Sequence, residues 1–336
     1  MAYSRLKLCV ACVVGCGTVL AGCGGPPTFV GTPTLANRVA QPFEGENASW
    51  MDPNATSWDL LYVTNGNAVV NVYRYWQHNL VGVLTGFRDP LGECVDKSGD
   101  VYVVDGGEYG QGVLEFVRGR KKPSRIIADS NYPSGCAVNY KTGDLAVANI
   151  RGGSGRGGSI SVYKRARGKP IVYSDQEGFI ACAYDGRGDL LATSYDGYSY
   201  YAASFAYLAK NAVRLSDIDI PGSSSSSYYR DVLGLAWDGK YWVIESYDDL
   251  YRVSIKKGVA SYIGDTTLDD RYTPNGPLAF YSPTYGGSAN QVAGAIYEDG
   301  NNNAVEYWKY PSGGAPYAAI THGLDYPYAS VVSLKP

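Results

Sequence analysis

Gly92-Glu-Cys-Val-Asp96-Lys-Ser-Gly99-Asp-Val-Tyr-Val-Val-Asp105 is the stretch that decides the fold. It predicts a short apolar strand, a tight turn at Asp96 and Gly99, and a second strand of alternating pattern. An aspartate hydrogen-bonds the backbone two residues on, and glycine tolerates a positive φ. Valine and tyrosine suit a pleated, half-buried surface. Two short strands joined by this turn are therefore the expected building unit.

The same phrase returns further along the chain, at intervals of 43, 46 and 53 residues. The later copies begin Gly135-Cys-Ala-Val-Asn139, Ala181-Cys-Ala-Tyr-Asp185 and Gly234-Leu-Ala-Trp-Asp238. Self-similarity at a period of 40 to 50 residues indicates a propeller or a solenoid. The longest interval contains the run Pro221-Gly-Ser-Ser-Ser-Ser-Ser227, which we interpret as a surface-loop insertion.

Each repeat is expected to hold four strands, named A to D in chain order. In the second repeat we place them at about 92–96, 100–105, 112–117 and 124–128. Equivalent B strands are expected to begin near Leu60, Val101, Leu145, Leu190, Tyr241 and Gln291. The prediction is an all-β chain whose residues 48–336 form a six-bladed β-propeller with four-stranded blades.

Two segments compete to complete the first blade, and the secondary structure of a third segment is ambiguous. Tyr326–Ser333 resembles the start of the third repeat and is expected to return as an A strand, but Ala48–Asp52 could take that place. The sequence leaves this choice open. The segment Tyr201–Leu215 is the one helix candidate, although its composition also suits a strand.

The first 22 residues have the features of a removable signal. Arg5 and Lys7 precede an apolar run that is too short and glycine-rich to span a membrane comfortably. The run ends in Leu20-Ala-Gly-Cys23, which resembles the lipobox of bacterial lipoproteins. That resemblance implies a signal peptide over 1–22, acylation (palmitate) of Cys23, and a mature chain that is lipid-anchored to a membrane of the bacterial cell envelope.

Residues 23–47 are rich in glycine, proline and threonine, which favours a flexible tether between lipid and propeller. The chain carries a net charge of −3, and loss of Arg5 and Lys7 makes it more negative. A nucleic-acid partner is therefore not expected.

Three cysteines are left once the signal and Cys23 are set aside. Cys94, Cys136 and Cys182 all lie in the first strand of successive repeats. We expect buried free thiols there, with a Cys136–Cys182 bridge as the alternative.

The repeat phrases also carry a family resemblance. Leu61-Tyr-Val-Thr-Asn65 is similar to the phrase of YVTN-type propellers, and Pro90–Asp105 resembles an NHL repeat. These families include scaffolds, lyases and lactonases, so the resemblance implies a fold more than an activity.

The ends of the B strands place five polar residues at equivalent positions around one face of the ring: Asn65, Asp105, Asn149, Ser194 and Glu245. Oxygen-rich rings of this kind can hold Ca²⁺, and gluconolactonase-type propellers are similar in binding one metal from such positions. The alternative, which we favour, is that each residue makes local hydrogen bonds in its own turn. Charged residues nearby could line the same mouth: Glu93, Glu108, Arg151, Asp196, Arg230 and Asp248.

Catalytic templates are scarce. His322 falls near the end of the last D strand, where a lyase of the propeller type would need a base.

Our first hypothesis is a non-enzymatic binding or scaffold lipoprotein that binds a protein or a glycan on a propeller face. The second is a metal-dependent lactonase-like hydrolase or lyase that uses the channel-mouth carboxylates.

Overall fold

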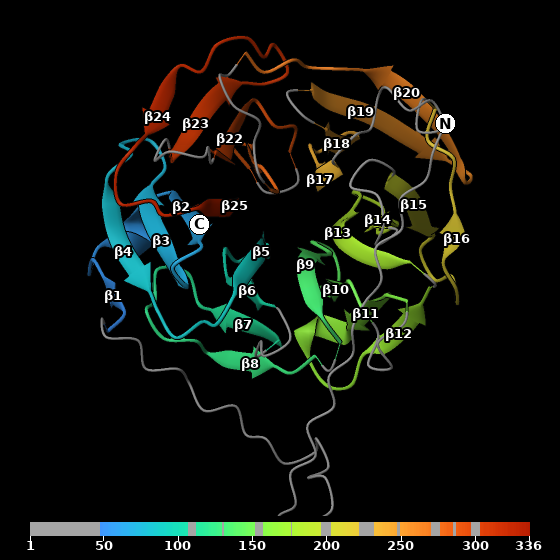
Figure 1. Ribbon diagram of the computed structural model, residues 1–336, viewed down its shortest axis with the longest axis horizontal. Coiled ribbons are helices and arrows are strands. Elements are labelled where there is room, and N and C mark those ends of the chain that lie inside the picture. Colours follow the sequence, from blue (N-terminus) through green and yellow to red (C-terminus); the bar gives the residue numbers. More distant parts are fainter. Residues whose placement is uncertain are drawn as a thin grey trace, which may run out of the picture. The chain divides into compact units, whose positions relative to one another are not determined.

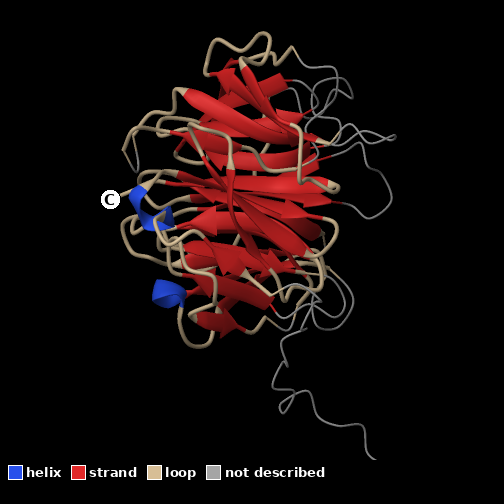
Figure 2. Cartoon of the chain, turned by 90° about the vertical axis from the view of Figure 1, so that its left-hand side faces the viewer, coloured by secondary structure: helices blue, strands red, loops and turns tan. Residues whose placement is uncertain are grey.

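The computed structural model describes residues 48–336, except for 107–111, 130, 152–156, 176, 196–202, 222–231, 247–248, 270–275, 285–286 and 297–302. Within the unit Gln41–Pro336, six antiparallel sheets are arranged as the blades of a six-bladed β-propeller (Figure 1). Helix is confined to two single turns of 3-10 type among these residues, Ala55–Ser57 and Lys164–Ala166 (Figure 2). The same residues include no helix with the length and apolar character needed to cross a membrane.

Blades 2 to 6 each use four consecutive strands, with strand A nearest the centre of the ring. Blades 2 and 3 contain β5 (Pro90–Val95), β6 (Val101–Asp105), β7 (Gly112–Phe116), β8 (Arg125–Ile127), β9 (Pro133–Val138), β10 (Leu145–Asn149), β11 (Ser159–Tyr163) and β12 (Ile171–Ser174). Blade 4 contains β13 (Gly178–Tyr184), β14 (Leu190–Tyr195), β15 (Ala203–Leu208) and β16 (Ser216–Asp217). Blades 5 and 6 contain β17 (Val232–Trp237), β18 (Trp242–Ser246), β19 (Asp249–Lys256), β20 (Val259–Gly264), β21 (Ala279–Tyr281), β22 (Gln291–Ile296), β23 (Ala304–Lys309) and β24 (Ala318–Ile320).

Blade 1 is built from both ends of the described chain. Its strands β2 (Leu60–Asn65), β3 (Val69–Arg74) and β4 (Leu80–Leu84) receive β25 (Pro327–Ser333) as strand A. β25 runs antiparallel to β2, with Leu60 opposite Ser333 and Asn65 opposite Pro327. The competing segment instead forms β1 (Trp50–Met51), which pairs with the outer strand β4. Blade 1 therefore has a fifth strand, and the C-terminal segment closes the ring.

The repeated turn forms as its sequence predicts. Asp96 Oδ1 accepts hydrogen bonds from the backbone N–H of Ser98 (2.8 Å) and Asp100 (3.0 Å), and Gly99 has a φ of +81°. The same hydrogen bond, from the backbone N–H two residues later to the side-chain Oδ1, is present at Asn139, Asp185 and Asp238. The ambiguous segment Tyr201–Leu215 supplies a strand, β15, rather than a helix.

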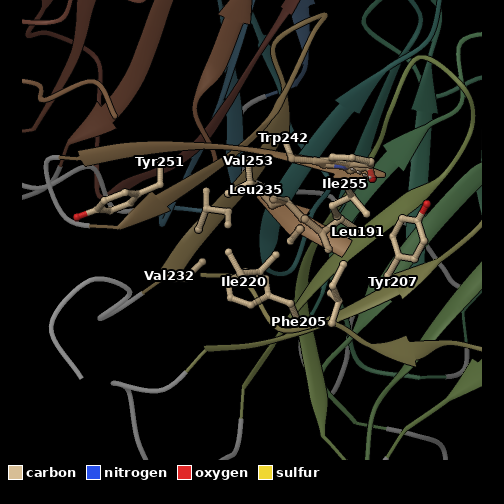
Figure 3. Close-up of a cluster of buried hydrophobic side chains, with 14 of the residues drawn as sticks. Leu191, Phe205, Tyr207, Ile220, Val232, Leu235, Trp242, Tyr251, Val253 and Ile255 are labelled. Carbon is tan, nitrogen blue, oxygen red and sulfur yellow. Dashed lines mark hydrogen bonds between the residues drawn. The ribbon is translucent and has the colours of Figure 1, made fainter. Parts of the chain in front are cut away.

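Apolar side chains fill the space between blades. Each of the six clusters in the described part of the chain lies between two neighbouring blades. Between blades 4 and 5, Leu191 and Phe205 face Trp242 (Figure 3). Burial of apolar surface contributes about 25 cal/mol per Å², so the stability of each blade depends on its neighbours.

The prediction of buried free thiols is confirmed for Cys182 and wrong for Cys94 and Cys136, and the alternative Cys136–Cys182 bridge is wrong. Cys94 in blade 2 and Cys136 in blade 3 form a disulfide, and Cys182 is a buried free thiol. Cys136 and Cys182 stand at the same position of the repeat, so their side chains point the same way, each toward the preceding blade. Cys94 stands one residue further along its strand and points to the following blade, because side chains alternate along a strand.

This geometry predicts a second bridge. Ala137 is the repeat equivalent of Cys94 and shares a buried cluster with Cys182. Ala137→Cys should therefore cross-link positions 137 and 182, detected by peptide mapping without reductant. The bridge should raise the free energy of unfolding by about 2–4 kcal/mol. Ala183→Cys is the matched control, because it faces Leu235 and has no thiol to meet. Absence of the 137–182 cross-link would contradict the assigned strand register.

Candidate functional site

The five polar residues at the B-strand ends are buried, and each is held by hydrogen bonds near its own position. Asp105 Oδ1 accepts from the backbone N–H of Arg88 and Asp89, both at 2.8 Å. Asn65 Oδ1 accepts from Asp325 N–H at 3.1 Å. These partners stand just ahead of strand A of the same blade. The two side chains therefore fasten the D–A connection, rather than the turn into strand C that the sequence suggested.

The other three make different contacts. Ser194 Oγ donates to Glu177 Oε2 at 2.6 Å, again ahead of its own strand A. The Asn149 amide donates to the Ser161 hydroxyl in strand C at 3.1 Å, while its Oδ1 is buried and meets no hydrogen-bond partner in the described part of the chain. Glu245 accepts from Leu278 N–H of the next blade at 3.1 Å and 3.2 Å. The hydrogen-bond partners of the five residues differ from blade to blade, as expected if each residue acts separately.

Two buried carboxyl groups, those of Glu93 and Glu245, have raised pKa values. Burial raises the pKa of Glu245 to about 8, against the opposing effect of the Leu278 hydrogen bond. Burial also raises the pKa of Glu93 well above its ordinary value. Both oxygens of Glu93 lack a hydrogen-bond partner among the described residues. Two repeat equivalents of Glu93 donate to backbone oxygens of the preceding blade: the free thiol of Cys182 to Ala146 and the hydroxyl of Ser330 to Ala293.

Two of the remaining candidates from the sequence, His322 and Arg151, lie in the described part of the chain. His322 is exposed on the β24–β25 connection, where its carbonyl accepts from the Tyr73 hydroxyl at 3.4 Å. Arg151 lies over the Tyr132 ring. Glu108, Asp196, Arg230, Asp248 and Cys23 lie outside the described residues. No three histidine, cysteine, aspartate or glutamate side chains within the described ranges are grouped as a metal site would need.

A cavity of about 160 Å³ lies in the central channel, lined by the A strands of all six blades. Its lining extends to the ends of these strands and into the A–B turns, at Gly239 and Thr284. The cavity therefore opens toward the face of the A–B turns. None of the five B-strand-end residues lines it. Sequence reasoning placed the ligand on the opposite face and missed this cavity.

Four aromatic residues from four successive blades line the cavity near this opening: Tyr140, Tyr184, Trp237 and Phe280. Tyr140 is exposed and the other three are half-buried. Trp237 is held by an edge contact with Trp242 at 5.1 Å between ring centres. Phe280 is held in the same way by Tyr310 at 5.2 Å. The opening is thus a fixed apolar and aromatic surface with some free ring area.

Polar groups at this opening are fixed as well. Asp238 accepts from the Tyr310 hydroxyl and from the backbone N–H of Lys240 and Tyr241, each at 2.7 Å. Ser282 and Thr284 line the adjoining wall. An apolar lining with a few placed polar groups is the usual composition of a small-ligand site. The narrow aromatic opening is therefore the candidate functional site.

Comparisons with known proteins bear on the fold alone. No known family and no curated protein matches the sequence. Among solved structures, the chain is similar to a functionally unknown protein from Desulfotomaculum acetoxidans DSM 771. The TM-score is 0.52 at 8% sequence identity, over 83% of this chain and 100% of the other. This likeness supports the propeller fold and assigns no role to either face.

Calcium provides a test of the B-strand-end residues. Asp105→Ala should lower the free energy of unfolding by about 2 kcal/mol, because a charged acceptor of two buried backbone donors is lost. If the five residues act separately, Ca²⁺ should leave the melting temperature of the wild type and of this variant unchanged. A Ca²⁺-dependent rise that both Asp105→Ala and Glu245→Ala abolish would contradict this, since a folded-state ligand stabilises by mass action.

Proposed function

We propose that the chain is a cell-envelope lipoprotein whose propeller is a non-enzymatic binding module for a glycan. The observation that carries the proposal is the cavity opening lined by Tyr140, Tyr184, Trp237 and Phe280. Sugar rings present apolar C–H faces that pack on aromatic rings, and their hydroxyls pair with carbonyls, hydroxyls and carboxylates at the edge of such a site. The cavity volume of about 160 Å³ fits a single sugar unit better than a folded protein surface.

A protein ligand is the other outcome within the same class. The lactonase-like or lyase function comes second, because it needs the B-strand-end carboxylates to act on one point. Their described hydrogen bonds instead lead into separate connections, such as Arg88 and Asp89 for Asp105 and Leu278 for Glu245. Glu245, with its pKa of about 8, is the one residue of the ring with the protonation of a general acid.

Glycan binding can be measured directly. We expect calorimetric titration with a panel of neutral oligosaccharides to yield at least one ligand. Trp237→Ala should weaken its binding about tenfold, equivalent to about 1.4 kcal/mol, through loss of one aromatic contact. Trp50→Ala is the matched control, because Trp50 is 43% exposed on β1, away from the cavity lining. Equal loss of affinity in both variants, or no binding across the panel, would refute the proposed site.

The envelope location depends on Cys23. Cys23→Ser should move the protein from the membrane fraction to the soluble fraction of cells, measured by ultracentrifugation and immunoblotting, because the only proposed anchor is lost. Persistence of the variant in the membrane pellet, after washing with high salt, would show that the lipobox assignment is wrong. The propeller itself should be unchanged, which a melting curve on the variant checks.

A further inference from the structure

The outer strand of each blade presents one edge to the outside of the ring. In blades 2, 4 and 6 this strand has only two or three residues, and β12 in blade 3 has four. In blade 1 the five-residue β4 is covered by β1. β20 in blade 5 has six residues and pairs with β19 alone among the described strands. It is the longest outer edge in the described propeller without a covering strand.

The side chains of β20 make this edge apolar. Val259 is 66% exposed, Tyr262 47% and Ile263 42%. The strand Val-Ala-Ser-Tyr-Ile-Gly contains no charge and no proline. Natural proteins protect exposed edges with charges, proline, short strands or a cover. Here the nearest flanking charges are outside the strand, at Lys257 before it and Asp265 after it.

The hairpin determines which backbone groups face outward. Lys257 and Gly258 form a two-residue turn with φ values of +53° and +75°, and Lys256 pairs with Val259 across it. The pair that flanks such a turn exchanges hydrogen bonds, and the direction of the backbone groups alternates from there along the strand. The N–H and C=O of Val259 and Ser261 therefore point to β19. Those of Ala260 and Tyr262 point to the outside.

We propose that β20 pairs antiparallel with β20 of a second copy of this chain, about a two-fold axis through Ser261. In this register Ala260 lies opposite Tyr262 of the other copy, so the outward backbone groups meet. Val259 lies opposite Ile263, which covers the exposed apolar side chains.

The same register fixes the charges. Lys257 and Asp265 each stand four residues from Ser261. Lys257 lies in the hairpin turn that precedes the paired strand, so the antiparallel pairing brings each turn lysine near the aspartate at the end of the other copy's strand, twice in the dimer. This self-complementarity favours a second copy over an unrelated peptide, and antiparallel edge pairing is already present in this fold where β1 covers β4.

A cysteine on the axis tests the register. Ser261 is exposed and would occupy a non-hydrogen-bonded antiparallel pair, where Cα atoms are about 4.5 Å apart. That separation suits a disulfide. Ser261→Cys in the full chain, purified in mild detergent and oxidised at low protein concentration, should give a covalent dimer linked through position 261, identified by peptide mapping. Ser174→Cys, also exposed on the edge of β12, is the matched control and should give no covalent dimer.

Charge reversal supplies the second measurement. Lys257→Asp should raise the dimer dissociation constant about tenfold in sedimentation velocity, because both cross-strand ion pairs are lost. Addition of Asp265→Lys should restore it. A monomeric wild type at all concentrations tested, equal cross-linking of both cysteine variants, or no rescue by the double reversal would each overturn the proposal.

Discussion

The pairing of β25 with β2 is the contact on which the rest of the propeller depends. It adds the last strand of the chain to blade 1, which holds the first strands of the ring, and so closes the ring. β25 also reaches its neighbours: Ser330 Oγ donates to Ala293 O of blade 6 at 3.1 Å, and Ser333 Oγ to Gly99 O of blade 2 at 2.6 Å. Three blades are thus fastened by one strand. Since every apolar cluster in the described ring lies between two blades, loss of this strand would open two interfaces at once.

Close approach of the A strands sets the width of the channel. A Cβ at Gly92 would lie 2.8 Å from the backbone oxygen of Ser134, and one at Gly135 would lie 2.6 Å from that of Ile180. Neighbouring A strands can approach this closely only if this repeat position has little or no side chain. The channel is narrow as a result. A ligand is therefore confined to the opening, where the strands end and side chains of Tyr184 and Trp237 are half-exposed.

Local chemistry explains how much of this could be predicted from the sequence. The turn at Asp96 and the B strands are local features, and each observed B strand begins within one residue of its expected start. The disulfide was missed because it depends on which way neighbouring strands of two blades direct their side chains. The partners of Asp105 and Asn65 were missed because they lie in D–A connections of irregular sequence. Three of the aromatic residues at the opening, Tyr184, Trp237 and Phe280, share one repeat position near the end of strand A, whereas Tyr140 stands two positions later in its repeat. The opening was missed because valine holds this position in the second and third repeats, at Val95 and Val138, and aromatic residues hold it only in the later ones.

The buried carboxyls constrain what the propeller can do near neutral pH. Glu93 and Glu245 have a pKa in the folded state above the ordinary value of 4.5. The folded chain therefore binds these protons more tightly than the unfolded chain does. Their stabilising effect is complete below 4.5 and is lost as the pH rises, for Glu245 up to its folded pKa of about 8. At pH 7 Glu245, with its pKa of about 8, is mainly protonated and acts as a neutral hydrogen-bonding group. A neutral carboxyl is a poor partner for Ca²⁺, whose ligands are carboxylates and carbonyl oxygens. The burial that fits Glu245 between two blades thus also disfavours it as a metal ligand, and the aromatic opening on the other face remains the better place for a ligand.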